Sequence, residues 1–380
     1  MDNLLAMIPF NKPYCSEKAL SYIKNVCDSD TLSGNGMYTK KCHSFFEKRY
    51  GFGKCLLTTS GTDALEMCAM LCNLSPEDEV IVPSFTFVST ALAFLREGCH
   101  LVFADCGTEN PNITLDQIKP LVTSHTKVIC VVHYAGVACD MEPIMEFANK
   151  RGIIVVEDAA HSTDSYYKDC ALGSIGHLAA FSFHETKNVS CGEGGMVVIN
   201  DERFAHRSEI IWEKGTNRAD FYKGLVNKYG WCDMGSSFLP SELNAAFLWA
   251  QLEELDTIQQ KRLHIWHLYD QILRGNIDDR FKLPSIPSYA TNNAHMYYIL
   301  CPSMTVRDNL IYSLKQANIQ AAFHYLPLHS SVFYSSRHDG RELPMCNYYS
   351  NCILRLPLYN DLSDSDAQYV GATVLHLTQE

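Results

Sequence analysis

Seven short apolar runs between residues 55 and 200 predict the strands of a single sheet. They occupy residues 55–59, 79–83, 100–105, 127–133, 153–158, 178–183 and 195–200. Stretches with apolar residues at helical spacing lie between several of them, for example residues 62–74 and 141–152. Strands that are apolar throughout and alternate with helices are typical of a mainly parallel sheet covered on both faces. We therefore expect an α/β fold with this sheet at its centre.

The pattern changes after residue 240. Residues 241–273 carry apolar side chains at helical spacing and predict one long helix. A linker punctuated by proline follows over residues 274–288, and the chain beyond it predicts a smaller mixed domain with a helix at 305–317. We expect a large domain over residues 1–240, including an N-terminal arm. The connecting helix and a smaller C-terminal α/β domain should occupy residues 241–380.

Composition and charge narrow the class of protein. The chain has 380 residues, of which 47% are hydrophobic and 19% charged, so it has enough apolar material for a large core. A net charge of −12 gives no general basic surface for nucleic acid or an anionic membrane. No run reaches the roughly 18 apolar residues of a membrane helix, and the N-terminus lacks the features of a secretory signal. These observations favour a cytoplasmic protein.

The sixteen cysteines are scattered through the expected strands and helices. None forms a C-x-x-C pair, which disfavours zinc ribbons and thioredoxin-like chemistry. We expect reduced thiols and no metal site.

The end of the first expected strand has the features of an anion site. Ser60, Gly61 and Thr62 form a small polar turn directly before a helix. Free backbone N–H groups and the positive end of the helix dipole attract an anion at such a position, with hydroxyl donors beside them. An ordinary helix cap is the alternative interpretation.

Two further strand ends carry candidate chemistry. Phe85 and Phe87 follow the second strand, where an aromatic side chain can lie on a flat ring, although such residues are also common in a core. Asp158 ends the fifth strand and His161 follows it. A carboxylate there can hold the protonated nitrogen of a heteroaromatic ring, or it can simply cap a helix.

Lys187 lies in the turn after the sixth strand, 29 residues beyond Asp158 and just before the glycine-rich segment CGEGG. A single lysine is usually a solvated surface residue. An anion site, an aromatic ring, a carboxylate and an amine at strand ends of one sheet are, however, the set that a pyridoxal phosphate enzyme requires. The combination therefore predicts that Lys187 forms a Schiff base with pyridoxal phosphate.

The motifs that carry these residues resemble, in order and spacing, the sugar aminotransferases of fold type I. They are SGTDAL, DEVIVPSFTFVST, VVHYAGVACDM, VVEDAAHS, SFHETKN followed by GEGGMVVIND, LNAAFLWAQLE and FHYLPLH. The resemblance covers residues 8–375 and implies the fold of that family. That fold has a large domain with a mainly parallel, mixed seven-stranded sheet and a smaller C-terminal α/β domain.

The resemblance also implies roles for individual residues. Lys187 matches the lysine that binds the cofactor covalently, and Asp158 matches the partner of the pyridine nitrogen. The remaining matches surround the same cofactor: His161 beside the ring oxygen, Phe87 over the ring face, and Gly61, Thr62 and Ser182 around the phosphate. One position departs from the family. Ser237 in GSSFL stands where many relatives have an asparagine that reaches the cofactor phosphate of the partner subunit.

For substrate, the resemblance implies a nucleotide-linked keto sugar. FHETKN, EKGTNR and KYGWCDMGSSFL resemble members that use L-glutamate to convert dTDP-4-keto-6-deoxyglucose into dTDP-4-amino-4,6-dideoxygalactose, for enterobacterial common antigen, O antigen or lipopolysaccharide. Arg218 is a candidate for the nucleotide diphosphate or the donor carboxylate, and a solvated loop arginine is the alternative. His324, Tyr325 and His329 are candidates for the sugar pocket, and packed aromatic residues would have the same pattern. A homodimer with shared active sites is expected.

The motifs leave alternatives for the product of the reaction and for the class of protein. The C4 epimer of the product and amination of a related dTDP-keto sugar at C3 are the alternatives. A related sugar dehydratase would have histidine in place of Lys187, and a nicotinamide-linked dehydrogenase would have G-x-G-x-x-G after the first strand. A non-catalytic pyridoxal-binding regulator is the more distant alternative, because it normally carries an added interaction domain.

Overall fold

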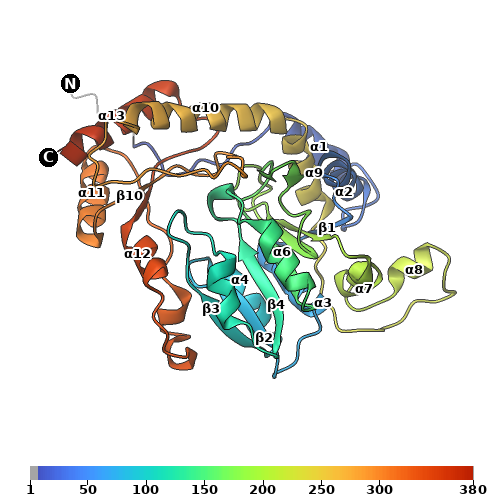
Figure 1. Ribbon diagram of the computed structural model, residues 1–380. Helices are drawn as coiled ribbons and strands as arrows, with labels where there is room; N and C mark the ends of the chain where they lie inside the picture. Colours follow the sequence, from blue (N-terminus) through green and yellow to red (C-terminus); the bar gives the residue numbers. More distant parts are fainter. Residues whose placement is uncertain (1–6, 380) are drawn as a thin grey trace.

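The computed structural model describes residues 7–379, and its centre is a seven-stranded sheet (Figure 1). The strand order is β1-β9-β8-β5-β4-β2-β3. The strands are β1 (Lys54–Thr58), β2 (Glu79–Pro83), β3 (His100–Ala104), β4 (Thr126–Val132), β5 (Ile154–Asp158), β8 (Leu178–Ser182) and β9 (Gly195–Ile199). Each observed boundary lies within one residue of the boundary expected from the apolar runs. The expected strands are confirmed.

The sheet is mainly parallel, as predicted. The pairs β2–β3, β2–β4, β4–β5 and β5–β8 are parallel, whereas β9 pairs antiparallel with both β1 and β8. Because β4, β5 and β8 are neighbours and parallel, their carboxyl ends lie along one edge of the sheet. Ligands of such sheets bind beyond that edge.

Helices cover both faces of the sheet. Side chains alternate along each strand, so that Val80 and Val82 of β2 pack in a different core cluster from Ile81 between them. The cluster with Val80 includes α3 (Gly61–Leu71), α4 (Val88–Leu95) and α7 (Ala205–Trp212). On the other face, α6 (Met141–Asn149) and the short α5 (Leu115–Ile118) contribute to the cluster around Ile81. Smaller elements complete this domain: β6 (Tyr166–Tyr167), β7 (Cys170–Ala171) and α8 (Arg218–Tyr222).

The single long helix predicted over residues 241–273 is wrong. The structure has two helices there, α9 (Glu242–Leu252) and α10 (Leu255–Leu273). At the junction, Glu254 leaves helical geometry and its carboxylate accepts hydrogen bonds from Tyr14 and Ser16 near the N-terminus. These contacts come from residues about 240 positions away, so the local pattern of apolar residues carries no sign of the break.

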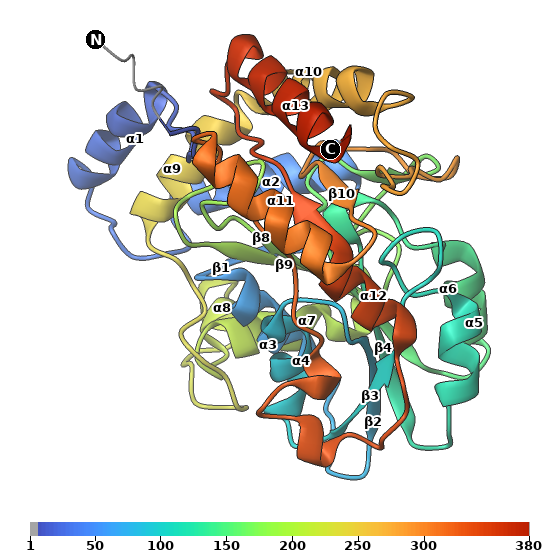
Figure 2. The same cartoon turned by 90° about the vertical axis from the view of Figure 1, so that its left-hand side faces the viewer.

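The C-terminal part of the chain follows α10, which runs along the top of the molecule in Figure 1. It contains β10 (Tyr298–Leu300) and β11 (Ile353–Arg355), which pair antiparallel, with α11 (Met304–Gln316), α12 (Pro344–Cys352) and α13 (Asp364–Gln379). Figure 2 shows α11, α12 and α13 together on one side of the molecule. The N-terminal segment reaches this part too, because Ile8 bridges to Ile319.

Glu242 of α9 stabilises the N-terminus of α2 (Met37–Tyr50), whose own N-cap residue is Gly36 and provides no side chain. The buried Glu242 carboxylate accepts hydrogen bonds from the backbone N–H groups of Gly36, Tyr38 and Thr39 at 2.9, 2.7 and 3.1 Å. A carboxylate at a helix N-terminus satisfies donors that have no partner within the helix and also interacts favourably with the dipole. This contact joins α2 to α9, and α1 (Lys18–Cys27) packs against α9 as well.

We therefore expect Glu242→Ala to lower the free energy of unfolding by about 2–5 kcal/mol, because two buried N–H groups and one part-buried N–H group lose their acceptor. Chemical denaturation followed by circular dichroism measures the change. The matched control is Glu253→Ala at the other end of α9, where a partly exposed carboxylate pairs with Lys18 and a loss below about 1 kcal/mol is expected. Equal losses in the two variants would contradict this account of α2.

All sixteen cysteines are free thiols in the structure. Between residues 7 and 379, no helix has the combination of length and apolar character needed to cross a membrane.

Candidate active site

A cavity of about 400 Å³ opens at the carboxyl edge of the sheet, beyond β5 and β8. The N-terminal ends of α3 and α4 form one side of it, and residues of the C-terminal part close another. Nine of the candidate residues line this cavity together: Gly61, Thr62, Phe87, Asp158, His161, Ser182, Lys187, His324 and Tyr325. The expectation that the motifs meet at one sheet edge is thus met in the structure.

Lys187 projects into the cavity from the turn that follows β8. The turn is held by a hydrogen bond from the Lys187 N–H to the carbonyl of His184. Burial lowers the pKa of the Lys187 amine to about 8; the Asp158 charge opposes this shift and the Arg355 charge adds to it. At pH 7 about a tenth of the amine is then uncharged, against less than about a thousandth for an ordinary lysine. Lys187 is therefore a nucleophilic amine near neutral pH.

Asp158 is buried at the carboxyl end of β5. Its carboxylate accepts hydrogen bonds from the Thr90 hydroxyl at 2.6 Å and from the Ala160 N–H at 3.1 Å. Burial raises the pKa of this carboxyl group, and the two hydrogen bonds and the Lys187 charge only partly oppose that shift. A protonated ring nitrogen would supply the cation that this carboxylate lacks.

The start of α3 provides the phosphate end of the cavity. Ser60 caps the helix by accepting a hydrogen bond from the Asp63 N–H. The N–H groups of Gly61 and Thr62, at the start of α3, have no partner within the helix. The Thr62 hydroxyl lies 2.7 Å from that of Ser89, and Ser182 faces them from the end of β8. Gly61 lies so close to Ser182 that a Cβ at this glycine would be 2.8 Å from the serine Cβ. The result is a cradle of small residues and hydroxyl groups suited to an anion.

We expect Gly61→Ala to weaken binding of pyridoxal phosphate by roughly 10- to 100-fold, because the new methyl group must displace Ser182 from the cradle. Titration of the apoprotein with the cofactor, followed by fluorescence, measures the affinity. Ser335→Ala is the control, since Ser335 is exposed and lies outside the cavity wall. An unchanged affinity in the Gly61 variant would remove this residue from the cradle.

His161 forms the far wall of the cavity. Its ring stacks on that of His295 with centroids 4.2 Å apart, and its buried Nδ1 has no hydrogen-bond partner. Burial, followed by the charges of Lys187 and His324, lowers the pKa of His161, so the ring is neutral.

Phe87 lies at the opening of the cavity. It is 56% exposed, and its ring centroid lies 6.1 Å from that of Tyr325. An unpaired polar atom and exposed aromatic faces suit a flat ring that carries a polar substituent.

His324 and Tyr325 reach the cavity from the C-terminal part of the chain. Their rings stack with centroids 3.9 Å apart. His324 is in hydrogen-bond contact with Arg355 and lies 3.4 Å from the hydroxyl of Tyr134. Burial lowers the pKa of His324 far below its usual range, and Arg355 and Lys187 add to the effect, so His324 is a neutral acceptor for the guanidinium.

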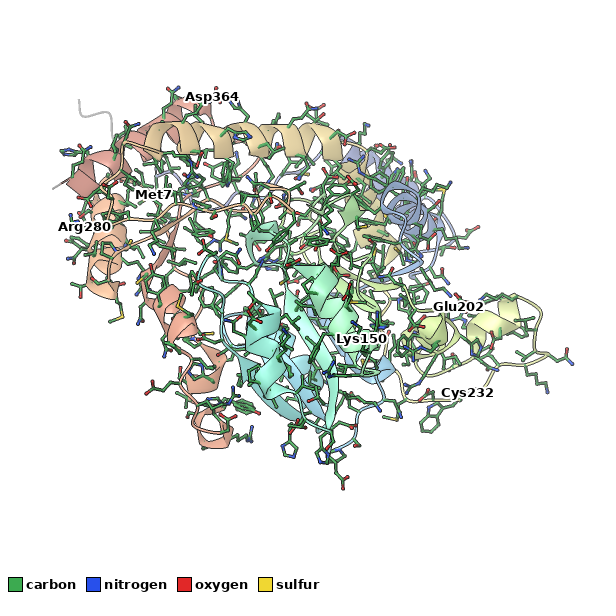
Figure 3. All side chains as sticks on the ribbon, viewed as in Figure 1. Met7, Lys150, Glu202, Cys232, Arg280 and Asp364 are labelled. Carbon is green, nitrogen blue, oxygen red and sulfur yellow. The ribbon has the colours of Figure 1, made fainter. Side chains whose placement is uncertain are left out.

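Three candidate residues lie outside the cavity wall. His329 is buried and bonded through Nδ1 to the hydroxyl of Ser84 at 2.7 Å, which is a structural contact between the two parts of the chain. Arg218 begins α8 and donates a hydrogen bond to the Tyr222 hydroxyl at 2.9 Å. Ser237 is exposed and pairs with Glu213 in an isolated bridge. The last two belong to a lobe that also carries Cys232, on the side of the molecule away from α11 and α12 (Figure 3).

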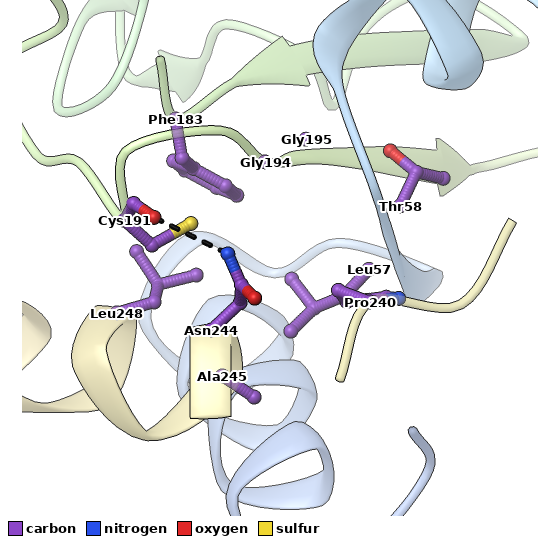
Figure 4. Close-up of a pocket in the computed structure, with 10 residues that line it drawn as sticks. All are labelled: Leu57, Thr58, Phe183, Cys191, Gly194, Gly195, Pro240, Asn244, Ala245 and Leu248. Carbon is purple, nitrogen blue, oxygen red and sulfur yellow. Dashed lines mark hydrogen bonds between the residues drawn. The ribbon is translucent and has the colours of Figure 1, made fainter. Parts of the chain in front are cut away.

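The glycine-rich segment after Lys187 is held by α9, as Figure 4 shows. The side-chain amide of Asn244 donates hydrogen bonds to the carbonyls of Cys191 and Glu193 at 3.3 and 3.2 Å. The space beside this contact is lined mainly by apolar side chains, such as Phe183 and Leu248, and encloses only about 10 Å³. It can hold a single water molecule at most, so it is a packing defect and not a second site.

Several residues around the cavity were not predicted from the sequence. They are Ser89, Thr90, Thr186, His295 and Arg355, of which the first three line the main cavity. Thr90 could have been found from the sequence, because it lies in the first turn of the helix that follows the second strand, and its hydroxyl is 2.8 Å from that of Thr86 just before this helix. His295 and Arg355 come from segments more than 100 residues beyond Lys187 and have no local signal.

The residues of the cavity fit pyridoxal phosphate. They provide an amine of lowered pKa, a buried carboxylate, an unpaired histidine nitrogen, and an anion cradle that a Cβ at Gly61 would fill.

Comparisons with known proteins point the same way. Residues 13–375 match the DegT/DnrJ/EryC1/StrS aminotransferase family. The chain is similar to the aminotransferase TlmJ of Streptoalloteichus hindustanus, with 28% identity and a TM-score of 0.89 over 98% of each chain.

Two further solved structures extend the comparison. DesV of S. venezuelae shares 26% identity, with a TM-score of 0.90 over 99% of each chain. Spr1654 of Streptococcus pneumoniae has the same fold, with 24% identity and a TM-score of 0.90 over 98% of this chain and 99% of its own, and has been solved in PMP and PLP forms. The chain belongs to the DegT/DnrJ/EryC1/StrS aminotransferase family and is a pyridoxal phosphate-dependent sugar aminotransferase that acts on nucleotide-linked keto sugars.

Proposed function

We propose that the protein transfers the amino group of L-glutamate to dTDP-4-keto-6-deoxyglucose and forms dTDP-4-amino-4,6-dideoxygalactose. The observation that carries the chemistry is the Lys187 amine of lowered pKa opposite the buried Asp158 carboxylate in one cavity. The choice of sugar rests on the resemblance of FHETKN, EKGTNR and KYGWCDMGSSFL to members that form this product. The reaction is balanced: glutamate becomes 2-oxoglutarate as the C4 carbonyl of the sugar becomes an amine.

When bound, pyridoxal phosphate carries the amino group between the two substrates and accepts the electron pair that a departing proton leaves behind. Gly61, Thr62 and Ser182 hold its phosphate in the cradle at the start of α3. Asp158, held in place by Thr90, keeps the ring nitrogen protonated. His161 offers its neutral Nδ1 to a polar substituent of the ring.

Lys187 is the acid–base group of the reaction. With the cofactor bound, its Nζ would take the proton from the α-carbon of the donor in one half-reaction, and it would give a proton to C4 of the sugar in the other. A base needs to be uncharged when it accepts a proton, and an amine of pKa about 8 meets that requirement far more often near pH 7 than an ordinary lysine. His324 and Tyr325 then border the space for the sugar.

We further propose a homodimer in which the lobe around α8 completes the partner's site. Its exposed apolar side chains support this, because Tyr222, Leu225, Trp231 and Met234 are 68–81% exposed. In such a dimer Arg218 meets the nucleotide diphosphate, for which a planar cation is suited, and Ser237 donates to the partner's cofactor phosphate. Light scattering across a dilution series tests the assembly, and a stable monomer would refute it.

The reaction is tested by incubating the holoenzyme with L-glutamate and a panel of nucleotide-linked keto sugars and determining the product stereochemistry by NMR. An axial C4 amine on the dTDP sugar is expected. An equatorial C4 amine or a C3 amine would instead identify the epimer or the C3 product. A protein that binds the cofactor without turning over any member of the panel would be a pyridoxal-binding regulator.

We place the activity in the cytoplasm, where it would supply amino sugars for a surface polysaccharide such as enterobacterial common antigen, O antigen or lipopolysaccharide.

A further inference from the structure

A network of buried polar side chains adjoins Lys187. Asn188, the next residue in the chain, is 5% exposed, and Gln259 of α10, Asn293 and His295 are buried as well. The last two belong to the segment that leads into β10. Taking polar side chains out of water is costly unless each of them finds hydrogen-bond partners. The partners of each side chain therefore show what the network holds.

The side-chain amide of Asn188 is the centre of the network. Its Nδ2 donates to the carbonyl of Asn293 at 2.8 Å and to Oε1 of Gln259 at 2.9 Å. A carbonyl can only accept, so the amide nitrogen is the atom that faces it, and Oδ1 faces Nδ1 of His295 at 2.9 Å. Burial lowers the pKa of His295, so its ring is neutral and the single N–H is the one that Asn188 accepts. Both ends of the amide are thus held in one orientation.

The same network holds the loop that carries His161. The ring of His295 stacks on that of His161, with centroids 4.2 Å apart and planes inclined by 19°. Asn293 adds a contact to the backbone, because its Nδ2 donates to the carbonyls of His161 and Thr163 at 2.7 and 2.9 Å. Its Oδ1 accepts from the N–H of His295 at 3.0 Å. The turn with Lys187 and the cavity wall with His161 are therefore tied to one set of side chains.

Asn188 marks the point where the Lys187 turn returns to the core. Residues 184–187 are half-buried or exposed, whereas Asn188 and the two residues after it are buried. The side chain of Asn188 joins this end of the turn to α10 through Gln259. Burial is the main cause that lowers the pKa of Lys187 to about 8. An outward shift of the turn would hydrate the amine and return its pKa toward the usual value of a lysine.

We propose that Asn188 and His295 are positioning residues. Their hydrogen bond fixes the turn so that the Lys187 amine stays out of water and faces the cavity, and the His295 ring holds His161 in the cavity wall. This inference rests on the proposed transamination, in which Lys187 is the acid–base group. Neither residue touches the reacting atoms; each acts through the residue that it holds.

The test measures the Lys187 amine in the apoprotein, independently of turnover. Acetic anhydride acetylates only the uncharged amine. The rate at which it modifies the peptide with Lys187, followed by mass spectrometry across a pH series, therefore reports the pKa of this amine. The wild-type pKa should be about 8. Asn188→Ala should raise it by about one unit or more, because the turn loses its anchor and the amine becomes hydrated.

Two variants of His295 separate its hydrogen bond from its ring. His295→Phe keeps an aromatic face for His161 but has no N–H for Asn188, so it should raise the Lys187 pKa as Asn188→Ala does. His295→Asn keeps an N–H donor close to the position of Nδ1 but has no ring, so the pKa should stay within about 0.3 of the wild-type value.

The lost ring should show in a second measurement, the affinity for pyridoxamine phosphate, which makes no bond to Lys187. Fluorescence titration should give a Kd about 5- to 10-fold higher for His295→Asn, because His161 loses the ring that supports it. His295→Phe should stay within about 2-fold of wild type.

Asn200→Ala is the matched control. Asn200 follows β9 at the opposite edge of the sheet, and its Nδ2 donates to the carbonyls of Gly173 and Gly176 at 2.8 and 2.9 Å. Its variant loses a comparable pair of hydrogen bonds outside the cavity wall. It should lower the melting temperature, as Asn188→Ala does, and leave the Lys187 pKa unchanged.

A lower melting temperature with an unchanged Lys187 pKa in Asn188→Ala would reduce the network to a structural role and overturn this inference. Equal behaviour of the two His295 variants in both measurements would overturn it as well. If Asn188→Ala does not fold, His295→Phe, which keeps an aromatic ring in place, carries the test of the hydrogen bond. The expected shifts in an enzyme that aminates no sugar would refute the proposed function and leave the positioning role standing.

Discussion

Lys187→Ala should abolish transamination, with a loss of at least about 10⁴-fold in turnover, because the variant has neither the amine that bonds to the cofactor nor the base that moves the proton. Two measurements check this. Single-turnover mixing with L-glutamate should give no conversion of the bound cofactor to its aminated form, as judged from its absorbance. Borohydride reduction followed by mass spectrometry should attach a pyridoxyl group to the wild-type peptide that contains Lys187, and to no peptide of the variant.

The matched control is Lys168→Ala. Lys168 is an exposed lysine that pairs with Glu142 and lies outside the cavity wall. Its variant should keep wild-type turnover and the adduct on Lys187. Substantial transamination by Lys187→Ala, or a borohydride adduct on another lysine, would refute the assignment of Lys187 as the reactive amine.

Asp158→Asn should reduce turnover by about 100- to 1000-fold while leaving the fold intact. The amide is nearly the same size as the carboxylate but carries no charge, so the ring nitrogen loses the partner that keeps it protonated. Removing the Thr90 hydroxyl with Thr90→Val should produce a smaller loss, since it removes the 2.6 Å hydrogen bond that holds Asp158 but leaves the carboxylate in place. Steady-state kinetics with matched cofactor content and the pH dependence of the cofactor absorbance measure both effects.

Asp78→Asn serves as the control for Asp158→Asn. Asp78 lies at the amino end of β2, at the opposite edge of the sheet, where its carboxylate accepts a hydrogen bond from the Ser75 N–H. That variant should retain wild-type kinetics and cofactor absorbance. If Asp158→Asn left the absorbance and the rate unchanged, the ring nitrogen would need another partner.

Much of the fold follows from local sequence patterns. The core strands are apolar throughout, and runs such as residues 153–158 and 178–183 place β5 and β8 within one residue of their observed ends. Parallel strands bring their carboxyl ends to one edge, so residues that follow those strands are neighbours in space as a matter of topology. This is why the sequence alone is enough to predict that Asp158, Ser182 and Lys187 share one site.

Residues that reach the site from distant segments cannot be assigned in the same way. His324 and His329 occupy the same motif and look equivalent in the sequence, yet His324 borders the cavity while His329 bonds to Ser84. Arg218 and Ser237 are expected near the cofactor or substrate, and in one chain they lie on an exposed lobe. Their proposed contacts depend on a second subunit, which the sequence of one chain does not position.

The sequence by itself determined the order of the strands along the chain, the α/β class, and the residues that follow strands: the Lys187 amine, the Asp158 carboxylate and the small residues at Gly61. These depend on short-range periodicity and on the residues adjacent to strand ends, whereas the family followed from the resemblance of the motifs. Only the tertiary structure decided the break between α9 and α10, the hydrogen bond from Thr90 to Asp158, and the burial of Arg355 against His324 of the cavity wall. The physical reason is that pairing, burial and the pKa of a group depend on atoms contributed by remote segments, and their positions exist only once the chain has folded.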